Sequence, residues 1–155
     1  MTSPPDERLP IPALMHHARG SYGEAARRAL AAAGFDDLPR NGGMVLAGLD
    51  AVPPEAGFTP QADAVGWLNR SKQAASQMVD TLVLRGYIER QVDPEDRRRM
   101  GVRVTERGRA AAAVIQSAVD SIDAALAQRI TPEELHGLRA GLEALGRIRR
   151  ESAAT

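Results

Sequence analysis

The sequence predicts a mainly α-helical fold with one small β-hairpin. Residues 87–92 and 100–104 alternate apolar and polar side chains, a pattern typical of half-buried strands. Two short helices, separated by about one turn, are predicted before them at residues 61–69 and 72–85. Two long helices are predicted after the hairpin. This order of elements indicates a winged helix-turn-helix core, with the hairpin as its wing, between helical flanks.

The N-terminal third is predicted to contain an arm, two helices and a loop. Residues 1–12 contain four prolines and are expected to form a flexible, extended arm. Residues 13–33 are rich in Ala, Leu, Met, Arg and Glu, so a helix is expected there that ends at Gly34. Residues 39–49 predict a shorter helix, which three glycines weaken, and the proline-rich residues 50–60 predict a loop.

Helix start and stop signals support the remaining elements. Ser71 is a good N-cap for the helix at residues 72–85, and Gly86 is its natural C-terminal stop. Thr105 is expected to cap the first long helix. The sequence from Thr131 to Glu134 has a Thr N-cap, a proline in the first turn and a glutamate three residues on, which together make a capping box.

The two long helices carry narrow apolar stripes at heptad-like spacing. These are Ile115, Val119, Ile122 and Leu126 in the first, and Leu135, Leu138, Leu142 and Leu145 in the second. Such stripes suit coiled-coil-like packing between subunits, so a homodimer is predicted. A monomeric helical bundle is the alternative.

Composition narrows the function classes. The chain has no cysteine, which excludes disulfides, thiolate zinc sites and thiol redox sensing. Its N-terminus lacks the apolar run of a secretion signal, and its apolar stretches are expected to be far too short for a membrane span. We therefore expect a cytoplasmic protein that has no membrane partner.

Charge is distributed unevenly although the formal net charge is zero. Residues 70–109 hold 10 basic and 6 acidic side chains, net +4, whereas residues 1–69 are net −3 and residues 110–155 are net −1. A basic region on a neutral protein favours contact with phosphates. On charge alone, a solvated excess of basic side chains is an equal alternative.

The residues from Ser71 to Gly108 resemble the MarR family of bacterial transcription regulators. The resemblance is carried by residues 71–77, 86–90, the run Asp93–Pro94–Glu95–Asp96–Arg97–Arg98, and residues 104–108. It implies one MarR-like domain over residues 13–155. Within it, residues 13–34 and 106–150 would form the helical dimerisation region, and residues 38–105 the winged DNA-binding lobe.

The resemblance also implies a function. A homodimeric regulator, expected to be a repressor, would bind a pseudo-palindromic operator in double-stranded DNA and be released by a small, often aromatic effector. The sequence does not reveal the effector, the operator, the regulated genes or whether transcription is repressed or activated. A winged-helix module that binds an acidic protein without an effector is the alternative.

Two groups of residues are candidates for contact with DNA. At the N-terminal end of the helix at residues 72–85, side chains can reach base edges in the major groove, where glutamine suits adenine and lysine suits guanine. In the wing, the resemblance implies that Arg98 enters the minor groove and that the Asp96 carboxylate holds its guanidinium in a fork. The candidates are Arg70, Ser71, Lys72, Gln73, Ser76, Gln77, Asp96, Arg97, Arg98 and Arg99.

An effector pocket is predicted by family analogy only. Its candidate lining residues are Met15, His16, Arg19, Tyr22 and Trp67, although core packing is the favoured interpretation of Trp67. His16 and His17 point apart on a helix and make a poor metal pair, so no metal or cofactor is expected. No phosphate-binding glycine loop or nucleophile–base pair is evident, so an enzyme is not predicted.

Overall fold

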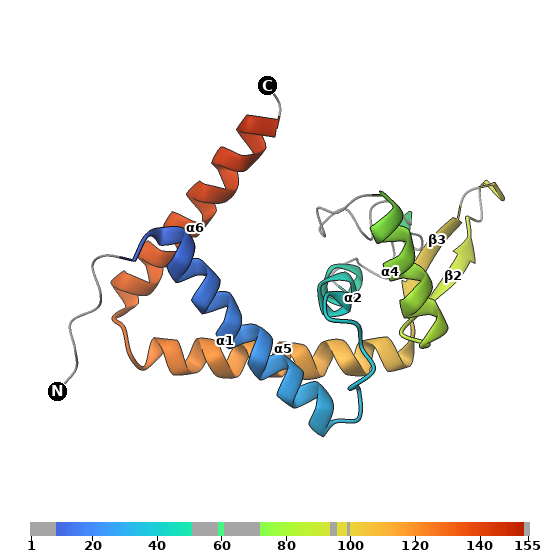
Figure 1. The fold of residues 1–155 in the computed structure, drawn as a ribbon, viewed down its shortest axis with the longest axis horizontal. Helices are drawn as coiled ribbons and strands as arrows, with labels where there is room; N and C mark the ends of the chain where they lie inside the picture. Colours follow the sequence, from blue (N-terminus) through green and yellow to red (C-terminus); the bar gives the residue numbers. More distant parts are fainter. Residues whose placement is uncertain (1–8, 51–58, 61–71, 94–95, 99, 154–155) are drawn as a thin grey trace. The chain divides into compact units, whose positions relative to one another are not determined.

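The computed structural model describes residues 9–50, 59–60, 72–93, 96–98 and 100–153. The described helices and strands follow the predicted order (Figure 1). The helices are α1 (Ile11–Ala32), α2 (Gly42–Asp50), α4 (Lys72–Leu84), α5 (Glu106–Ala127) and α6 (Pro132–Ala153). The strands are β1 (Thr59–Pro60), β2 (Ile88–Val92) and β3 (Met100–Val104). The helix expected at residues 61–69 lies outside the described residues.

The first helix begins earlier than the prolines suggested. Helix α1 starts at Ile11, directly after Pro10, so residues 11 and 12 are not part of an extended arm as expected. A proline is compatible with the first turn of a helix, because the backbone N–H that it lacks would have no partner there. The helix ends as predicted, with Gly34 in the left-handed region at φ 81°.

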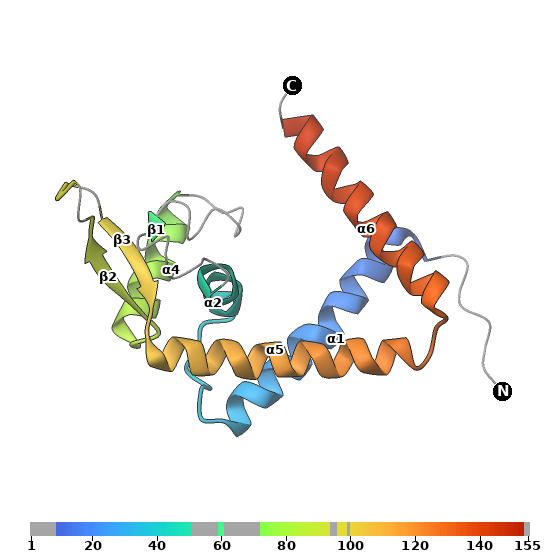
Figure 2. The ribbon, with the colours of Figure 1, turned by 180° about the vertical axis from the view of Figure 1, so that it is seen from behind.

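The strands form one antiparallel sheet in the order β1-β3-β2 (Figure 2). The hairpin pairs Ile88 with Val104 at its base and Val92 with Met100 next to its loop, which confirms the predicted wing. Thr59 and Pro60 add a two-residue strand to β3, where only a loop was expected. An edge position tolerates Pro60, because an edge strand leaves one row of backbone groups unpaired.

The core of the winged lobe lies between α2, α4, the sheet and the first half of α5. Its most fully buried side chains are Val45, Leu46, Val79, Leu82, Tyr87, Ile88 and Val102. The glycines that weakened the prediction of α2 allow this packing. A Cβ on Gly42 would lie 3.0 Å from Leu82 Cδ2, and one on Gly43 would lie 2.8 Å from Ile115 Cδ1. Close approach of α2 to its neighbours therefore offsets the low helix propensity of glycine.

The chain divides into two compact units, Met1–Val119 and Asp120–Thr155. The second unit contains the end of α5 and all of α6. The predicted capping box is present at the start of α6. The backbone N–H of Thr131 donates to Glu134 Oε2 at 2.8 Å, and that of Glu134 donates to Thr131 Oγ1 at 3.2 Å. These hydrogen bonds hold the pKa of Glu134 below its usual value.

Helix α5 is long and apolar enough to cross a membrane when only length and composition are considered. This differs from the expectation that every apolar stretch is far too short, because the alanines of α5 count as apolar. The core helix of a soluble protein meets the same test. Ala111 and Ala112 of α5 are buried in the core of the lobe.

Candidate nucleic-acid interface

Helix α4 has one buried and one exposed face, as predicted. Ala75, Val79 and Leu82 are buried, whereas Gln73, Gln77 and Asp80 are exposed and Ser76 is half-buried. Lys72 begins the helix, and Arg70 and Ser71 lie outside the described residues. The exposed face offers amide and hydroxyl groups, the side chains that can read base edges by paired hydrogen bonds.

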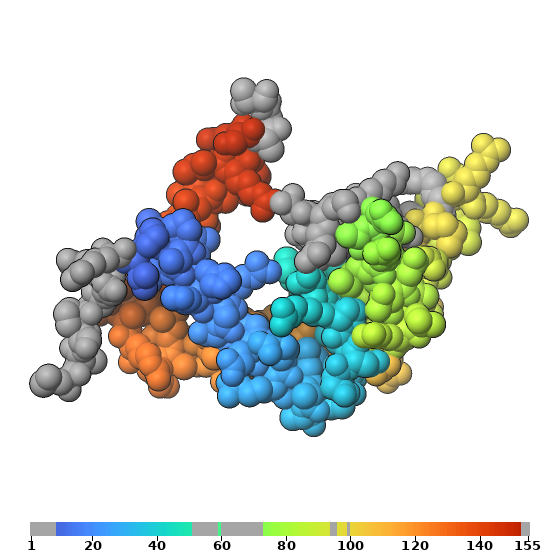
Figure 3. Space-filling model, in the orientation of Figure 1, coloured from blue at the N-terminus to red at the C-terminus, as the bar shows by residue number. Residues whose placement is uncertain are grey.

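The loop of the hairpin presents arginines to solvent. Asp96, Arg97 and Arg98 are exposed, and Arg99 lies outside the described residues. Figure 3 shows the hairpin projecting beyond α4 on the same side of the lobe. The contact within the loop differs from the expected fork: Asp96 Oδ1 accepts a hydrogen bond from the backbone N–H of Arg98 at 3.0 Å. The carboxylate therefore shapes the turn that carries Arg98.

An ion pair joins helix α4 to the hairpin. Arg90 of β2 binds Asp80 of α4 through its guanidinium. A second pair, between Arg103 and Glu89, crosses the two strands of the hairpin. Both pairs are partly exposed, so each contributes little to the free energy of unfolding, about 0.2–1 kcal/mol. The Arg90–Asp80 pair links α4 to β2, and the Arg103–Glu89 pair links β2 to β3. Both pairs make the arginine less available as a phosphate contact.

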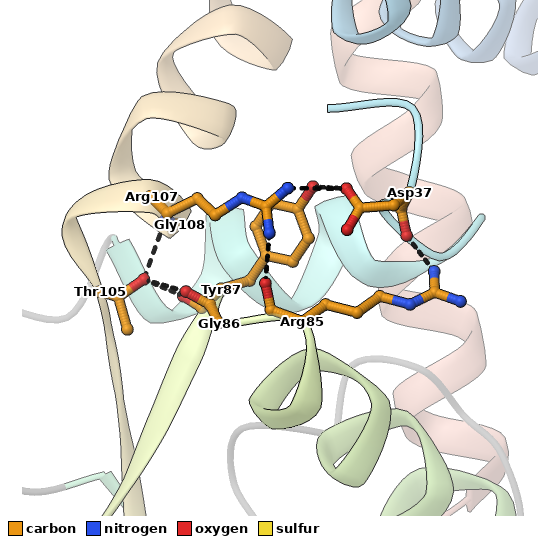
Figure 4. Close-up of polar contacts among 7 residues, drawn as sticks. All are labelled: Asp37, Arg85, Gly86, Tyr87, Thr105, Arg107 and Gly108. Atoms are coloured by element: carbon orange, nitrogen blue, oxygen red, sulfur yellow. Dashed lines mark hydrogen bonds and ion pairs between the residues drawn. The ribbon is translucent and has the colours of Figure 1, made fainter. Parts of the chain in front are cut away.

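A group of residues that the sequence did not predict lies at the C-terminal end of α4 (Figure 4). We call Asp37, Arg85, Tyr87 and Arg107 the Asp37 cluster. Tyr87 donates its phenolic hydrogen to Asp37 Oδ1, and Arg107 Nη2 donates to the same oxygen at 3.0 Å. Arg85 donates to the backbone carbonyl of Asp37, and Arg107 Nη1 donates to the carbonyl of Arg85. The Arg107 guanidinium also lies 4.5 Å from the centre of the Tyr87 ring.

Backbone contacts beside the Asp37 cluster attach the hairpin to α5. The Thr105 hydroxyl lies 2.6 Å from the carbonyl oxygen of Gly86 and 3.1 Å from the Gly108 N–H that donates to it. The Thr105 N–H donates to the carbonyl of Tyr87 at 3.1 Å. A Cβ on Gly108 would lie 2.1 Å from that carbonyl oxygen, so only glycine fits there. Thr105 therefore caps α5, as predicted, and also binds the turn after α4.

The Asp37 cluster shifts two pKa values in opposite directions. The hydrogen bond from Tyr87, supported by the charge of Arg107, lowers the pKa of Asp37. Burial, and then the hydrogen bond to Asp37, raise the pKa of Tyr87 to about 12. The carboxylate and the neutral phenol are therefore the favoured forms around neutral pH.

Sequence signals for this cluster are weak. Tyr87 and Arg107, like the neighbouring Thr105 and Gly108, lie in segments that resemble the family, although of these residues only Thr105 was assigned a role. Asp37 is 50 residues from Tyr87 and 70 from Arg107 along the chain, and no local pattern reports such a contact.

The structure describes four of the five residues proposed for an effector pocket. Met15, His16 and Arg19 are exposed on α1, Tyr22 on the same helix is half-buried, and Trp67 lies outside the described residues. Among the residues that the structure describes, no group of three or more His, Cys, Asp or Glu side chains could hold a metal ion.

A helix with an exposed polar face, followed by a hairpin with arginines in its loop, defines a winged helix-turn-helix protein. Comparison with solved structures agrees. A DNA complex of S. aureus MepR superimposes with a TM-score of 0.72 at 22% identity, over 89% of this chain and 97% of that one. Apo MarR from E. coli superimposes with a TM-score of 0.64 at 22% identity, over 90% of this chain and 98% of that one.

The family model agrees with the fold. Residues 36–99, which include α2, α4 and the first strand of the hairpin, β2, match the model described as the MarR family. No curated protein matches the chain. Residues 36–99 therefore match the family that the resemblance implied, and the fold is that of winged helix-turn-helix proteins such as S. aureus MepR and E. coli MarR.

Proposed function

We propose that the protein is a transcription regulator that binds double-stranded DNA with α4 in the major groove and the hairpin in the adjacent minor groove. One observation carries the proposal: the exposed polar face of α4 and the exposed Arg97 and Arg98 lie on elements that the Arg90–Asp80 ion pair joins. This ion pair, together with the core that α4 and the hairpin strands share, holds the exposed face of α4 and the hairpin loop in a fixed relation. The similarity in fold to S. aureus MepR, which has been solved with DNA, supports the proposal.

Each surface has a distinct role in this proposal. Gln73, Ser76 and Gln77 meet base edges, where a good bidentate contact discriminates by about 1–3 kcal/mol. Arg98 enters the minor groove, which is narrow and strongly negative in A·T-rich DNA. Arg97 binds phosphate, which adds affinity without sequence preference.

We also propose a homodimer that acts as a cytoplasmic repressor without enzymatic activity. Two lobes that recognise half-sites about 34 Å apart would require a pseudo-palindromic operator. A small aromatic effector that binds beside Tyr22 on α1 would release the DNA. A mobility-shift assay with DNA that flanks the gene, with and without aromatic ligands, tests both the operator and the effector.

Substitution of the wing arginines tests the contact with DNA. Arg98→Ala should weaken binding to an A·T-flanked duplex by about 1–3 kcal/mol, or about 5-fold to 150-fold. The loss of affinity should be smaller on a G·C-flanked duplex. Arg97→Ala, the neighbouring control, should weaken binding to both duplexes equally and reduce the dependence of log affinity on log salt by about one. Arg139→Ala, on exposed α6, should leave affinity unchanged.

The main alternative is a winged-helix module that binds an acidic protein. In that case the protein would show no salt-dependent affinity for duplex DNA. Affinity for duplex DNA that Arg98→Ala does not change would show that the proposed role of the wing is wrong.

A further inference from the structure

Both chain connections between the winged lobe and its flanking helices pass the C-terminal end of α4. The chain enters the lobe through the segment between α1 and α2, which contains Asp37, and leaves it through Thr105 at the start of α5. The Asp37 cluster joins these two connections to each other. We propose that Asp37, with Tyr87 and Arg107, is a positioning group that sets the orientation of α4 relative to the first half of α5.

The geometry explains why a second attachment matters. The Thr105 cap and the close approach of Gly108 attach the turn after α4 to α5 within one short stretch of backbone. The packing of Val79 and Leu82 in the core also holds α4, but apolar packing is not directional, so small rotations about a single polar attachment stay possible. Asp37 adds a second attachment, because its Oδ1 accepts a hydrogen bond both from Tyr87 and from Arg107. Rotation of α4 against α5 would break these hydrogen bonds.

Small rotations would have large effects at the DNA. Helix α4 has 13 residues, so its N-terminal end lies about 18 Å from Arg85. A rotation of about 10° about the C-terminal end would move the N-terminal end by about 3 Å, as long as a hydrogen bond to a base edge. Positioning by the cluster would therefore control whether the exposed residues of α4 reach their bases.

Because the Asp37 cluster is partly exposed, we infer that it orients α4 more than it stabilises the fold. The side chains of Arg107 and Asp37 are 42% and 39% exposed, so their ion pair is screened by solvent and stabilises the fold only weakly. Asp36, the neighbouring residue, carries the same charge, but the chain leaves it exposed and it is not part of the cluster. Asp36→Asn is therefore a matched control for Asp37→Asn.

The inference rests on the proposed function, and its test measures how affinity depends on operator geometry. Symmetric duplexes would be selected by the wild-type protein from a random library, and their half-site separation would then be varied in steps of one base pair. At the preferred separation, Asp37→Asn and Tyr87→Phe should each bind about tenfold more weakly, which corresponds to about 1.4 kcal/mol. Both should also lose much of the preference for one separation, whereas Asp36→Asn should behave as wild type.

Urea denaturation of the same samples separates positioning from folding. Unchanged affinity and separation preference in both variants would overturn this inference while the proposed function stands. An equal loss at every separation, together with a lower denaturation midpoint, would indicate a purely structural role and would also overturn it. No duplex binding by the wild-type protein would overturn the proposed function, and this inference with it.

Discussion

At the scale of single residues, Tyr87 combines a core position with a polar partner. Its ring is fully buried among the core side chains, and its hydroxyl donates to Asp37. The cost of burying a phenolate and the nearby carboxylate both favour the neutral phenol, which is why its pKa rises to about 12. The neutral phenol thus keeps the Asp37 cluster intact over a wide pH range.

The two shifted pKa values determine in which direction stability changes with pH. The folded-state pKa of Tyr87 lies above its ordinary value of 10.0, so its contribution to stability is fully present below about pH 10 and is lost as pH rises through about 12. The folded-state pKa of Asp37 lies below its ordinary value of 3.8. Its contribution is therefore present above about pH 4 and is lost as pH falls through the lowered value.

Titration of the tyrosine absorbance would test the raised pKa. The chain has only two tyrosines, so in a Tyr22→Phe variant Tyr87 is the only phenol. Its tyrosinate absorbance should stay low through pH 10 and rise near pH 12. The same variant unfolded in urea is the control and should titrate near pH 10. A folded variant that also titrates near pH 10 would contradict both the burial of Tyr87 and its hydrogen bond to Asp37.

At the scale of elements, the sequence was informative where the signals are local. The caps at Thr105 and Thr131, the stops at Gly34 and Gly86, and the two hairpin strands were confirmed. Burial along these strands does not alternate as predicted, because Val92 and Met100 next to the hairpin loop are exposed. Strand β1 was missed because two residues, one of them proline, carry no periodic pattern. The sequence also did not predict the contacts of Gly42 and Gly43, because their partners, Leu82 and Ile115, lie far along the chain.

The contact between α2 and α5 can be tested by changing both sides. Gly43→Ala would place a methyl group 2.8 Å from Ile115 Cδ1, and this overpacking should cost about 1–2 kcal/mol, partly offset by better helix propensity. Ile115→Val removes that Cδ1 and alone should cost about 0.5–1.5 kcal/mol. Because the second change makes room for the first, the double variant should lose about 1 kcal/mol less than the two costs combined.

Urea denaturation at fixed protein concentration would measure these changes. Gly20→Ala in α1 is the control, because a Cβ there meets no atom within 4 Å and should give the helix-propensity gain alone. Additive costs in the double variant would show that Gly43 and Ile115 are not in contact.

At the scale of the whole molecule, helix α6 carries apolar side chains that the chain itself leaves largely exposed. Leu138, Leu142 and Leu145 of the predicted stripe are 45%, 44% and 40% exposed, and Ile148 extends the stripe at 57%. Fully burying such a side chain contributes about 1.5–3 kcal/mol, so covering these half-exposed ones would contribute about 1 kcal/mol each. The proposed second copy of the chain would supply that cover.

Charge placed in this stripe should therefore abolish the proposed dimer. Leu142→Glu would put a carboxylate into the apolar contact, and burial of an unpaired charge costs several kcal/mol. Sedimentation should show a monomer at concentrations at which the wild-type protein is a dimer. Binding to a two-half-site operator should fall to the level of a single half-site, because the lobe itself is unchanged.

Ala140→Glu, at an exposed position off the stripe, should leave the dimer intact. A dimer that survives Leu142→Glu, or a wild-type monomer that binds an asymmetric site tightly, would show that the α6 stripe does not join two DNA-binding lobes.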